Sequence, residues 1–246
     1  MNNLYTQLSE VYEAMYKTFI NYEDELNFYS SLLMKFHCRS VLEIGCGTGN
    51  LAPGFIRLGF DYYGLDLSGE MLQIAKRNYP LCRFIEADMR NFQLDEKTEA
   101  CIMTGRTISY LVKNKDIFDA LSSINKNLHA QGILCFDFID ANKFIPHIKN
   151  GKSITHKAPY KNKVFRRESQ WQADFTQSWS FVWHSVYYEE RENGQLEKIG
   201  EDDSTIRTLG KDEILLFLEL TGFRLKEFIS RSSYAFDTFV VVAEKT

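Results

Sequence analysis

Residues 41–50 read VLEIGCGTGN, and this stretch decides how the rest of the chain is interpreted. Its first four residues are mostly apolar and suit a short strand that is buried on both faces. Gly45, Gly47 and Gly49 follow, where a backbone can turn sharply and let a ligand approach closely. A strand, a glycine loop and then a helix is the arrangement by which open α/β sheets bind nucleotide-like ligands at the carboxyl ends of parallel strands.

The spacing of the glycines narrows the choice of ligand. A dinucleotide fingerprint would need its third glycine at position 50, where the chain has Asn50, and a phosphate-binding P-loop would need Gly-Lys-Ser/Thr. The remaining pattern is E-x-G-x-G-x-G, which starts at Glu43. A carboxylate at this point repels a diphosphate but suits a ligand that carries an ammonium and a sulfonium group. The segment resembles motif I of the class I S-adenosylmethionine-dependent methyltransferases.

The next fifty residues continue the alternation of strands and helices. Residues 60–65 predict a second strand that ends at Asp66, where an acidic side chain can accept hydrogen bonds from both ribose hydroxyls. Residues 69–79 predict a helix with Ser68 as its N-cap and Met71 on its inner face. Further strands are expected over residues 82–86, 98–104 and 134–138.

The resemblance also implies roles for single residues. In the family, the acid after the third strand bonds the adenine amino group and its neighbour packs on the ring, which assigns these roles to Asp88 and Met89. Cys46 stands in the glycine loop, where the family often has cysteine, and we expect it to make a backbone contact. The residues expected to bind S-adenosylmethionine are Tyr12, Glu43, Gly45, Cys46, Gly47, Asp66, Leu67, Met71, Asp88, Met89 and Thr104.

Two segments lie outside this core. Residues 1–37 predict a helical cover, with Leu8, Val11, Tyr12 and Met15 at helical spacing and a second helix over residues 23–36. In many small-molecule methyltransferases such a leading helix lies over the cofactor, which favours a cofactor contact for Tyr12. A tyrosine at helical spacing is also common in a core, and the sequence leaves both alternatives open.

Residues 153–208 predict a small inserted sheet of three antiparallel strands, with a hairpin turn at Asn193-Gly194. Trp179, Phe181 and Trp183 alternate onto one face of it, and His184 falls on the other. The aromatic face could stack on a flat substrate, or it could pack on the core or on a second subunit. A homodimer through this sheet is therefore one expectation.

The sequence then returns to the core, with a helix over residues 211–220 and strands over residues 224–230 and 238–244. The predicted fold is a single α/β domain over residues 1–246. It consists of a Rossmann-like, seven-stranded, mostly parallel sheet with helices on both faces, plus the inserted antiparallel sheet.

Composition excludes several other classes of protein. The chain has 246 residues, of which 44% are hydrophobic and 25% charged, as in ordinary globular domains. The net charge is -4 and there is no long basic run, which disfavours nucleic acid as a substrate. We find no secretory signal and no apolar run long enough to span a membrane, so we expect a cytoplasmic protein. The five cysteines are scattered without metal-ligand spacing, and we expect no metal site.

Within the family, the chain resembles small-molecule enzymes of the sugar-nucleotide N-methyltransferase type. The shared features are ADMRNF after the third strand, the turn at residues 108–111 and the inserted sheet. It departs from them at Arg106-Thr107 and at residues 137–139, which line the substrate side, so the amino-sugar substrate is not implied.

The expected activity is methyl transfer to nitrogen or oxygen of a small metabolite. The candidate catalytic residues are Tyr110 to orient the nucleophile, Arg106 to clamp an acidic group, and His184, with Asp137 as a further candidate. The alternatives are an RNA methyltransferase and a non-catalytic protein that binds the cofactor as a partner subunit.

Overall fold

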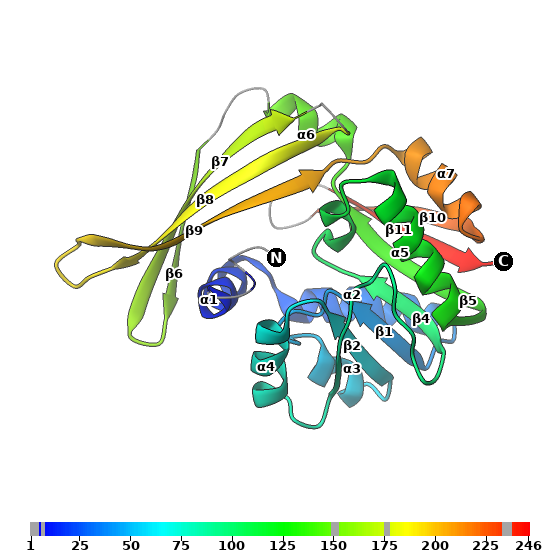
Figure 1. Cartoon of the computed structure of the whole chain (residues 1–246). Coiled ribbons are helices and arrows are strands. Elements are labelled where there is room, and N and C mark those ends of the chain that lie inside the picture. The colour runs from blue at the N-terminus through cyan, green and yellow to red at the C-terminus, as the bar shows by residue number, and fades with distance from the viewer. Residues whose placement is uncertain (1–4, 6–7, 149–152, 175–177, 233–237) are drawn as a thin grey trace.

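The computed structural model describes residues 5, 8–148, 153–174, 178–232 and 238–246, and these form two separate sheets (Figure 1). The larger sheet has seven strands in the order β10-β11-β5-β4-β1-β2-β3. Its strands are β1 (Ser40–Ile44), β2 (Asp61–Asp66), β3 (Arg83–Glu86), β4 (Thr98–Met103), β5 (Leu128–Phe138), β10 (Phe223–Arg231) and β11 (Thr238–Lys245). The predicted seven-stranded, mostly parallel sheet is thus confirmed.

Strand β1 lies in the interior of this sheet and pairs in parallel with β2 and β4. Its apolar residues are buried because helices cover both faces, which explains why they follow one another without polar alternation. Strand β11 runs antiparallel to both β5 and β10, and β10 is the edge strand on that side of the sheet. The order places the glycine loop after β1 between the ends of β2 and β4, where the chain reverses its direction of winding.

Two apolar layers hold the helices to the sheet. Helices α2 (Tyr22–Lys35) and α3 (Ala52–Arg57) pack on one face, and α5 (Asn114–Asn127) and α7 (Lys211–Leu220) on the other. Helix α4 (Gly69–Asn78) follows β2 and contacts β2 and β3. Ser68 caps α4 by accepting a hydrogen bond from the Met71 backbone N–H, as the sequence predicted.

The inserted sheet has four strands, so the prediction of three was wrong by one. Its strands, in the order β6-β7-β8-β9, are β6 (Ile154–Tyr160), β7 (Lys163–Asp174), β8 (Ser180–Glu190) and β9 (Leu196–Arg207). The additional strand β6 contains Pro159, which tends to argue against a strand but is tolerated at a sheet edge. The predicted turn at Asn193-Gly194 joins β8 to β9, with Gly194 at a positive φ of 79°.

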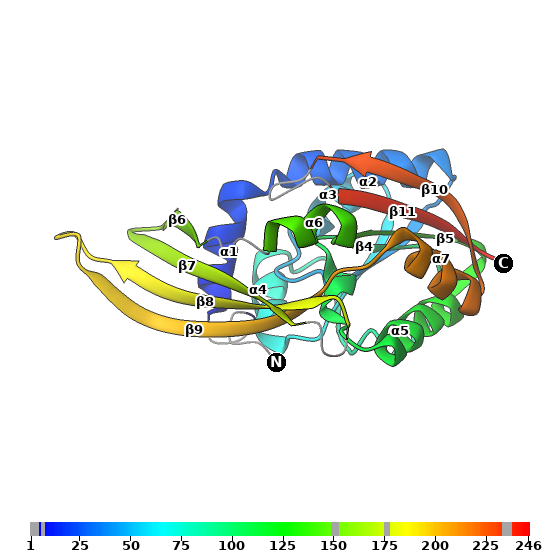
Figure 2. The same cartoon turned by 90° about the horizontal axis from the view of Figure 1, so that it is seen from above.

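Helices α1 (Ser9–Phe19) and α6 (Ala141–Ile148) pack on the inner face of the inserted sheet (Figures 1 and 2). Helix α1 contacts β6 and β7, and it lies beside the carboxyl ends of the core strands. The sheet projects outward from the core and holds α1 against the edge where the glycine loop lies. The leading helix is therefore held in place by a segment more than 140 residues further along the chain.

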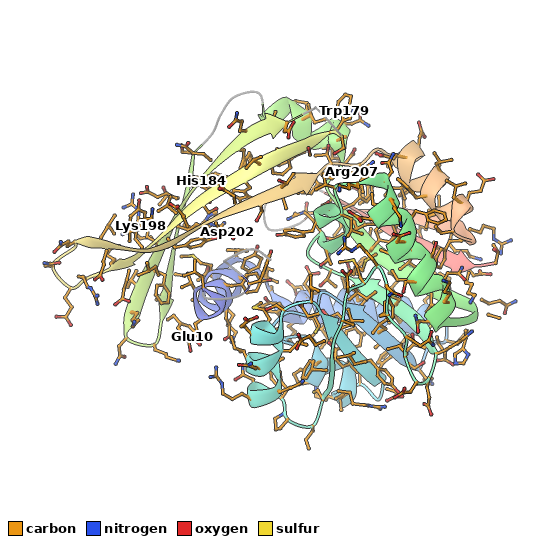
Figure 3. The ribbon with its side chains drawn as sticks, viewed as in Figure 1. Glu10, Trp179, His184, Lys198, Asp202 and Arg207 are labelled. Atoms are coloured by element: carbon orange, nitrogen blue, oxygen red, sulfur yellow. The ribbon has the colours of Figure 1, made fainter. Side chains whose placement is uncertain are left out.

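Arg207 fixes the end of the inserted sheet to the core (Figure 3). Its guanidinium donates hydrogen bonds to the Val112 carbonyl at 2.9 Å and to Asn114 Oδ1 at 2.6 Å, and it forms an ion pair with Glu213. The residue is 3% exposed, so these contacts satisfy a charge that is otherwise costly to bury. Within the described residues, we find no helix with the length and apolar character needed to cross a membrane.

Candidate functional site

A cavity of about 360 Å³ runs along the carboxyl ends of the core strands, a size typical of small-molecule sites. Residues from the glycine loop, from the ends of β2, β3, β4 and β5, and from α1 line it. The cavity therefore lies where the sequence predicted a nucleotide-like ligand.

The glycine loop presents bare backbone to this cavity. The N–H groups of Gly45 and Cys46 both donate to the Leu65 carbonyl, at 2.7 and 3.1 Å, which ties the loop to the end of β2. Gly45 and Gly47 have positive φ values of 74° and 54°, which side chains rarely adopt. A Cβ atom at Gly45 would lie 2.6 Å from Thr107 Oγ1, so the loop has no room for a side chain there.

Asp66 lies at the end of β2, and its two carboxylate oxygens bond two different segments, the glycine loop and the start of α4. Its Oδ2 accepts the Gly47 N–H and its Oδ1 accepts the Ser68 N–H, both at 2.8 Å. Burial raises the pKa of this carboxyl above its ordinary value, and the two backbone hydrogen bonds oppose that effect. A carboxylate held in this way and lining a cavity can also accept hydrogen bonds from a bound diol.

Glu43 is the second carboxyl at the loop, and it is only 3% exposed. Tyr62 Oη donates a hydrogen bond to its Oε2. Burial raises the pKa of Glu43 to about 7, and the nearby Asp66 raises it further while the hydrogen bond from Tyr62 lowers it. A cation bound beside Glu43 would favour its ionised form, which fits a sulfonium ligand.

Asp88 and Met89 lie at the opposite side of the loop, after β3, together with Leu67. Arg90 pairs with Asp88 at 2.5 Å and with Asp116 at 3.2 Å. The hydrogen bonds from Arg90 hold the pKa of Asp88 below its ordinary value. Asp88 is thus an anionic acceptor in a fixed orientation, as the expected contact with an adenine amino group requires.

Tyrosines form the cover of the cavity. Tyr12 and Tyr16 stack on one turn of α1 with ring centroids 3.9 Å apart, and Tyr5 contacts Tyr12 at 5.3 Å. The Tyr5 hydroxyl shares a hydrogen bond with the hydroxyl of Tyr110, which belongs to the 3-10 helix η2 (Thr107–Tyr110) after β4. The phenol groups therefore face the same space as the glycine loop.

The structure brings together every residue expected to bind the cofactor, and it adds Tyr110. All of them line the single cavity described above: Tyr12, Glu43, Gly45, Cys46, Gly47, Asp66, Leu67, Met71, Asp88, Met89, Thr104 and Tyr110. The residues fit S-adenosylmethionine because bare loop backbone, paired carboxyls and aromatic faces meet in one place. Their individual roles remain predictions.

Two candidate catalytic residues are not brought to the cavity. Arg106 has a left-handed backbone with φ of 63°, is 6% exposed, and does not belong to the cavity lining. Its backbone N–H donates to Asp137 Oδ1 at 2.8 Å, so the backbone at Arg106 helps to hold that carboxyl in place. His184 lies on β8 of the inserted sheet, half exposed, and bonds Asp203 at 2.6 Å (Figure 3).

The aromatic face of the inserted sheet packs within the protein. Phe181 is fully buried against Phe144 of α6, with ring centroids 4.8 Å apart, and Trp183 lies against Trp171. Trp179 precedes β8 and is 62% exposed. Of the alternatives for this face, packing on the rest of the chain is therefore the one observed for Phe181 and Trp183.

Sequence reasoning missed one end of the cavity. Three residues that line it were not singled out: Glu25, Arg231 and Thr238. They come from α2 and the ends of β10 and β11, which meet only in the folded chain. No group of three or more His, Cys, Asp or Glu residues that could hold a metal is found in the described part of the chain.

Comparisons with known proteins agree with this geometry. Residues 41–132 match a family model described as a methyltransferase domain. The chain is 31% identical over 101 residues to a putative methyltransferase, YqeM, of Bacillus subtilis. It is 30% identical over 95 residues to dTDP-3-amino-3,4,6-trideoxy-alpha-D-glucopyranose N,N-dimethyltransferase of Streptomyces venezuelae. Each match spans 39% of this chain. The matched part is 41% of YqeM and 40% of the dimethyltransferase, so the likeness covers less than half of either relative.

Solved structures extend the likeness of fold over the whole chain. DesVI of Streptomyces venezuelae superposes with a TM-score of 0.83 at 19% identity, covering 97% of this chain and 98% of that one. CalS10 of Micromonospora echinaspora, an amino pentose methyltransferase solved with S-adenosylmethionine bound, gives 0.76 at 19% identity, covering 96% and 97%. The inserted sheet and the leading helix are thus included in the shared fold.

The loop geometry, the single cavity that gathers the predicted cofactor positions, and the match over residues 41–132 lead to one conclusion. Residues 41–132 match a methyltransferase domain, and the chain as a whole has the fold of the solved methyltransferases with which it superposes.

Proposed function

We propose that this protein is an enzyme that transfers the methyl group of S-adenosylmethionine to a small molecule, with nitrogen favoured over oxygen as the acceptor atom. The observation that carries the proposal is the cavity, which extends from Asp88 past the glycine loop to Asp137 and Arg231. Its lining includes residues beyond those expected to bind the cofactor, and this additional part of the cavity supports a second, small ligand. The relatives include a sugar N,N-dimethyltransferase and a glycine/sarcosine N-methyltransferase, which supports nitrogen as the acceptor atom.

The bound cofactor supplies an electrophilic methyl group that is already activated by the sulfonium. The residues of the chain then have two tasks, which are to hold the acceptor in line with that methyl group and to exclude water. We assign the first task in part to Tyr110, because its hydroxyl faces the cavity and is oriented by Tyr5. The tyrosine cover on α1 serves the second.

Small molecules are favoured over RNA by charge as well as by shape. The net charge is -4, and the cavity is lined by the carboxyls of Glu25, Glu43, Asp66 and Asp137. A polyanion gains little from such a surface. The five free cysteines support a cytoplasmic, reducing environment for the reaction.

One experiment tests the proposal. The full chain is incubated with S-adenosylmethionine carrying a ¹³C-labelled methyl group and, in separate reactions, with a small-molecule extract or with bulk RNA. Labelled products are identified by mass spectrometry. We expect a labelled small molecule with the intact chain and none with Asp66→Asn, which lacks the charge at the end of β2. Label that enters only bulk RNA, or that enters nothing while the cofactor is bound, would support the RNA or the non-catalytic alternative.

We further propose that the homodimer expected from the sequence uses the outer face of the inserted sheet, since α1 and α6 cover the inner face. Light scattering on the full chain measures its mass in solution. A monomer at micromolar concentration would contradict the dimer without affecting the proposed activity.

A further inference from the structure

The cavity has an end that the cofactor positions do not account for. Beyond Thr104 at the end of β4, it is lined by six residues from α1, α2, β5, β10 and β11: Ile20, Tyr22, Glu25, Asp137, Arg231 and Thr238. The sheet order places β5 and β11 on one side of β4, and β2, which ends at Asp66, and β3, which precedes Asp88, on the other. This end of the cavity therefore lies across the glycine loop from the expected adenine site.

Asp137 is the buried charge at this end, and it is only 7% exposed. Its Oδ1 accepts the backbone N–H of Arg106 at 2.8 Å. Among the described residues, no donor forms a hydrogen bond to its other oxygen, Oδ2, although the side chain lines the cavity. A buried carboxylate normally has partners for both oxygens, so the second oxygen is a point where a ligand donor fits.

Arg231 does not provide that partner, because Glu25 and an aromatic ring already hold it. Its Nη1 bonds Glu25 Oε2 at 2.8 Å, and its guanidinium lies over the Phe28 ring at 4.3 Å. Figure 2 shows α2 and β10, which carry these residues, side by side. Glu25 and Arg231 thus offset each other, and the Oδ2 atom of Asp137 is the carboxylate oxygen at this end for which no donor is found among the described residues.

Two further groups describe the surroundings of Asp137. Burial raises its pKa to about 6, the positive charge of Arg106 opposes that effect, and the charge of Glu25 adds to it. The Tyr29 hydroxyl is fully buried and, within the described residues, has no hydrogen-bond partner. After burial, the charge of Asp137 is the largest influence that raises the pKa of Tyr29. The carboxylate therefore gains most from a partner that carries a positive charge.

An aromatic residue lines the same end of the cavity. Tyr22 begins α2 and belongs to the residues that line this end. The faces of tyrosine rings attract cations. A carboxylate oxygen and an aromatic residue at one end of a cavity favour an ammonium ion over a neutral alcohol.

We propose that the methyl acceptor is an aliphatic amine that enters as its ammonium ion, and that Asp137 binds this ion through Oδ2 and takes one of its protons. This inference rests on the proposed function and deepens it by naming the acceptor and the residue that selects it. The neutral amine then forms a bond from its nitrogen lone pair to the methyl carbon. The carbon–sulfur bond breaks, its electron pair stays on sulfur, the product leaves as an N-methylammonium ion, and the proton on Asp137 passes to water.

The first test uses the intact chain and needs no variant. Matched acceptors, glucosamine with glucose and ethanolamine with ethylene glycol, are supplied together with the small-molecule extract and with cofactor labelled at the methyl carbon. We expect the ¹³C NMR chemical shift of the transferred methyl group to lie in the range of N-methyl carbons for every product. A product with an O-methyl signal would overturn the inference while leaving the proposed function intact, whereas the absence of any labelled product would remove both.

The second test assigns the role to Asp137. In Asp137→Asn we expect the KM for the amine to rise roughly tenfold or more. The variant loses a charged hydrogen bond to the ammonium ion, and such a bond is worth about 1.5 to 3 kcal/mol. Affinity for S-adenosylhomocysteine, measured by calorimetry, should change less than about twofold, because substitutions at one site have little effect on contacts made at a separate site. Asp140→Asn is the matched control, because Asp140 is equally buried near the same strand end but does not line the cavity.

Two results would overturn the assignment. The first is an unchanged KM for the amine, and the second is an equal loss of affinity for S-adenosylhomocysteine, which would place Asp137 at the cofactor. A pH profile gives an independent readout. The charged and titratable groups around Asp137 are Arg106, Glu25, Arg231 and Tyr29. We expect kcat/KM of the intact chain to fall below about pH 6, and Asp137→Asn should remove this fall.

Discussion

Asp66 Oδ2 lies 2.8 Å from the backbone nitrogen of Gly47 and accepts its hydrogen bond. The side chain expected to hold the ribose thus also fixes the bend of the loop that receives the rest of the ligand. Because the other oxygen bonds Ser68, the carboxylate links the glycine loop to the start of α4. One residue therefore controls both the shape of the site and a contact within it.

Asp66→Asn should weaken cofactor binding strongly. The amide removes the charge and places an N–H donor against the N–H of Gly47 or Ser68. Because a charged hydrogen bond is worth about 1.5 to 3 kcal/mol, its loss should raise the Kd roughly 10- to 100-fold. Calorimetric titration with S-adenosylhomocysteine measures the change. Asp61→Asn is the control, since Asp61 starts the same strand but pairs with Arg83 at the surface. Equal affinities for the intact chain and Asp66→Asn would remove Asp66 from the site.

Gly45→Ala should disrupt the loop more than its backbone angle alone explains. Its new Cβ would lie 2.6 Å from Thr107 Oγ1, whereas Gly59, at φ of 84°, has no atom within 4 Å of an added Cβ. Gly59→Ala should therefore cost about 1 kcal/mol from backbone strain and leave cofactor affinity unchanged. Thermal unfolding and calorimetry together separate strain from collision. Similar results for the two variants would show that Thr107 moves aside freely.

Tyr110→Phe should slow turnover and leave cofactor affinity nearly unchanged. The hydroxyl that bonds Tyr5 is lost, while the ring stays against the cavity. A positioned proton-transfer group contributes about 10²- to 10⁴-fold, and an orienting hydrogen bond less, so we expect kcat to fall at least tenfold. Tyr188→Phe, on the outer part of β8, serves as the control. Full activity of Tyr110→Phe would exclude the proposed role.

The affinity for S-adenosylmethionine should rise with pH through about 7. Glu43 has a pKa raised to about 7 by burial, and its ionised form attracts the sulfonium. S-adenosylhomocysteine lacks the sulfonium charge and should show a weaker dependence, and Glu43→Gln should flatten the curve for both ligands. Titrations at pH 6 and pH 8 measure these differences. A pH-independent affinity in the intact chain would contradict the assignment.

The same carboxyl should make the ligand-free protein less stable at higher pH. The folded-state pKa of Glu43 is raised above its ordinary value of 4.5, so its contribution is fully present below that value and is lost as the pH rises through about 7. The loss is on the order of 3 kcal/mol. Urea unfolding between pH 5 and 8 measures it, and Glu43→Gln should remove this part of the slope. If the two proteins lose stability in parallel, another group is responsible.

His184→Ala should leave kcat/KM within about twofold of the intact chain, because His184 lies outside the cavity on an exposed part of β8. Its pair with Asp203 is at the surface, where such pairs are worth about 0 to 1 kcal/mol. Steady-state kinetics with the acceptor found above tests this. A large loss of activity would restore His184 as a catalytic candidate.

The sequence predicted the sheet well because each of its signals is local. The apolar run at residues 41–44 suits a strand that is buried on both faces, the positive φ values at Gly45 and Gly47 favour glycine, and Ser68 caps the helix that follows it. Spacing along the chain fixed the positions of Asp66 and Asp88, because each comes directly after a parallel strand. Strand β6 escaped prediction because an edge strand can carry Pro159 and polar residues.

The acceptor end of the cavity depends on contacts that no local pattern contains. Asp137, Glu25 and Arg231 lie on β5, α2 and β10, and the antiparallel pairing of β11 with β5 and β10 brings them together. Likewise, Arg106 follows β4 as closely as Tyr110 does, but its left-handed backbone turns its N–H to Asp137 and leaves its side chain out of the cavity lining. Local chemistry along the chain thus determined the fold and the cofactor positions. Only the tertiary structure decided which charges remain unpaired beside them, because that depends on which strand ends become neighbours.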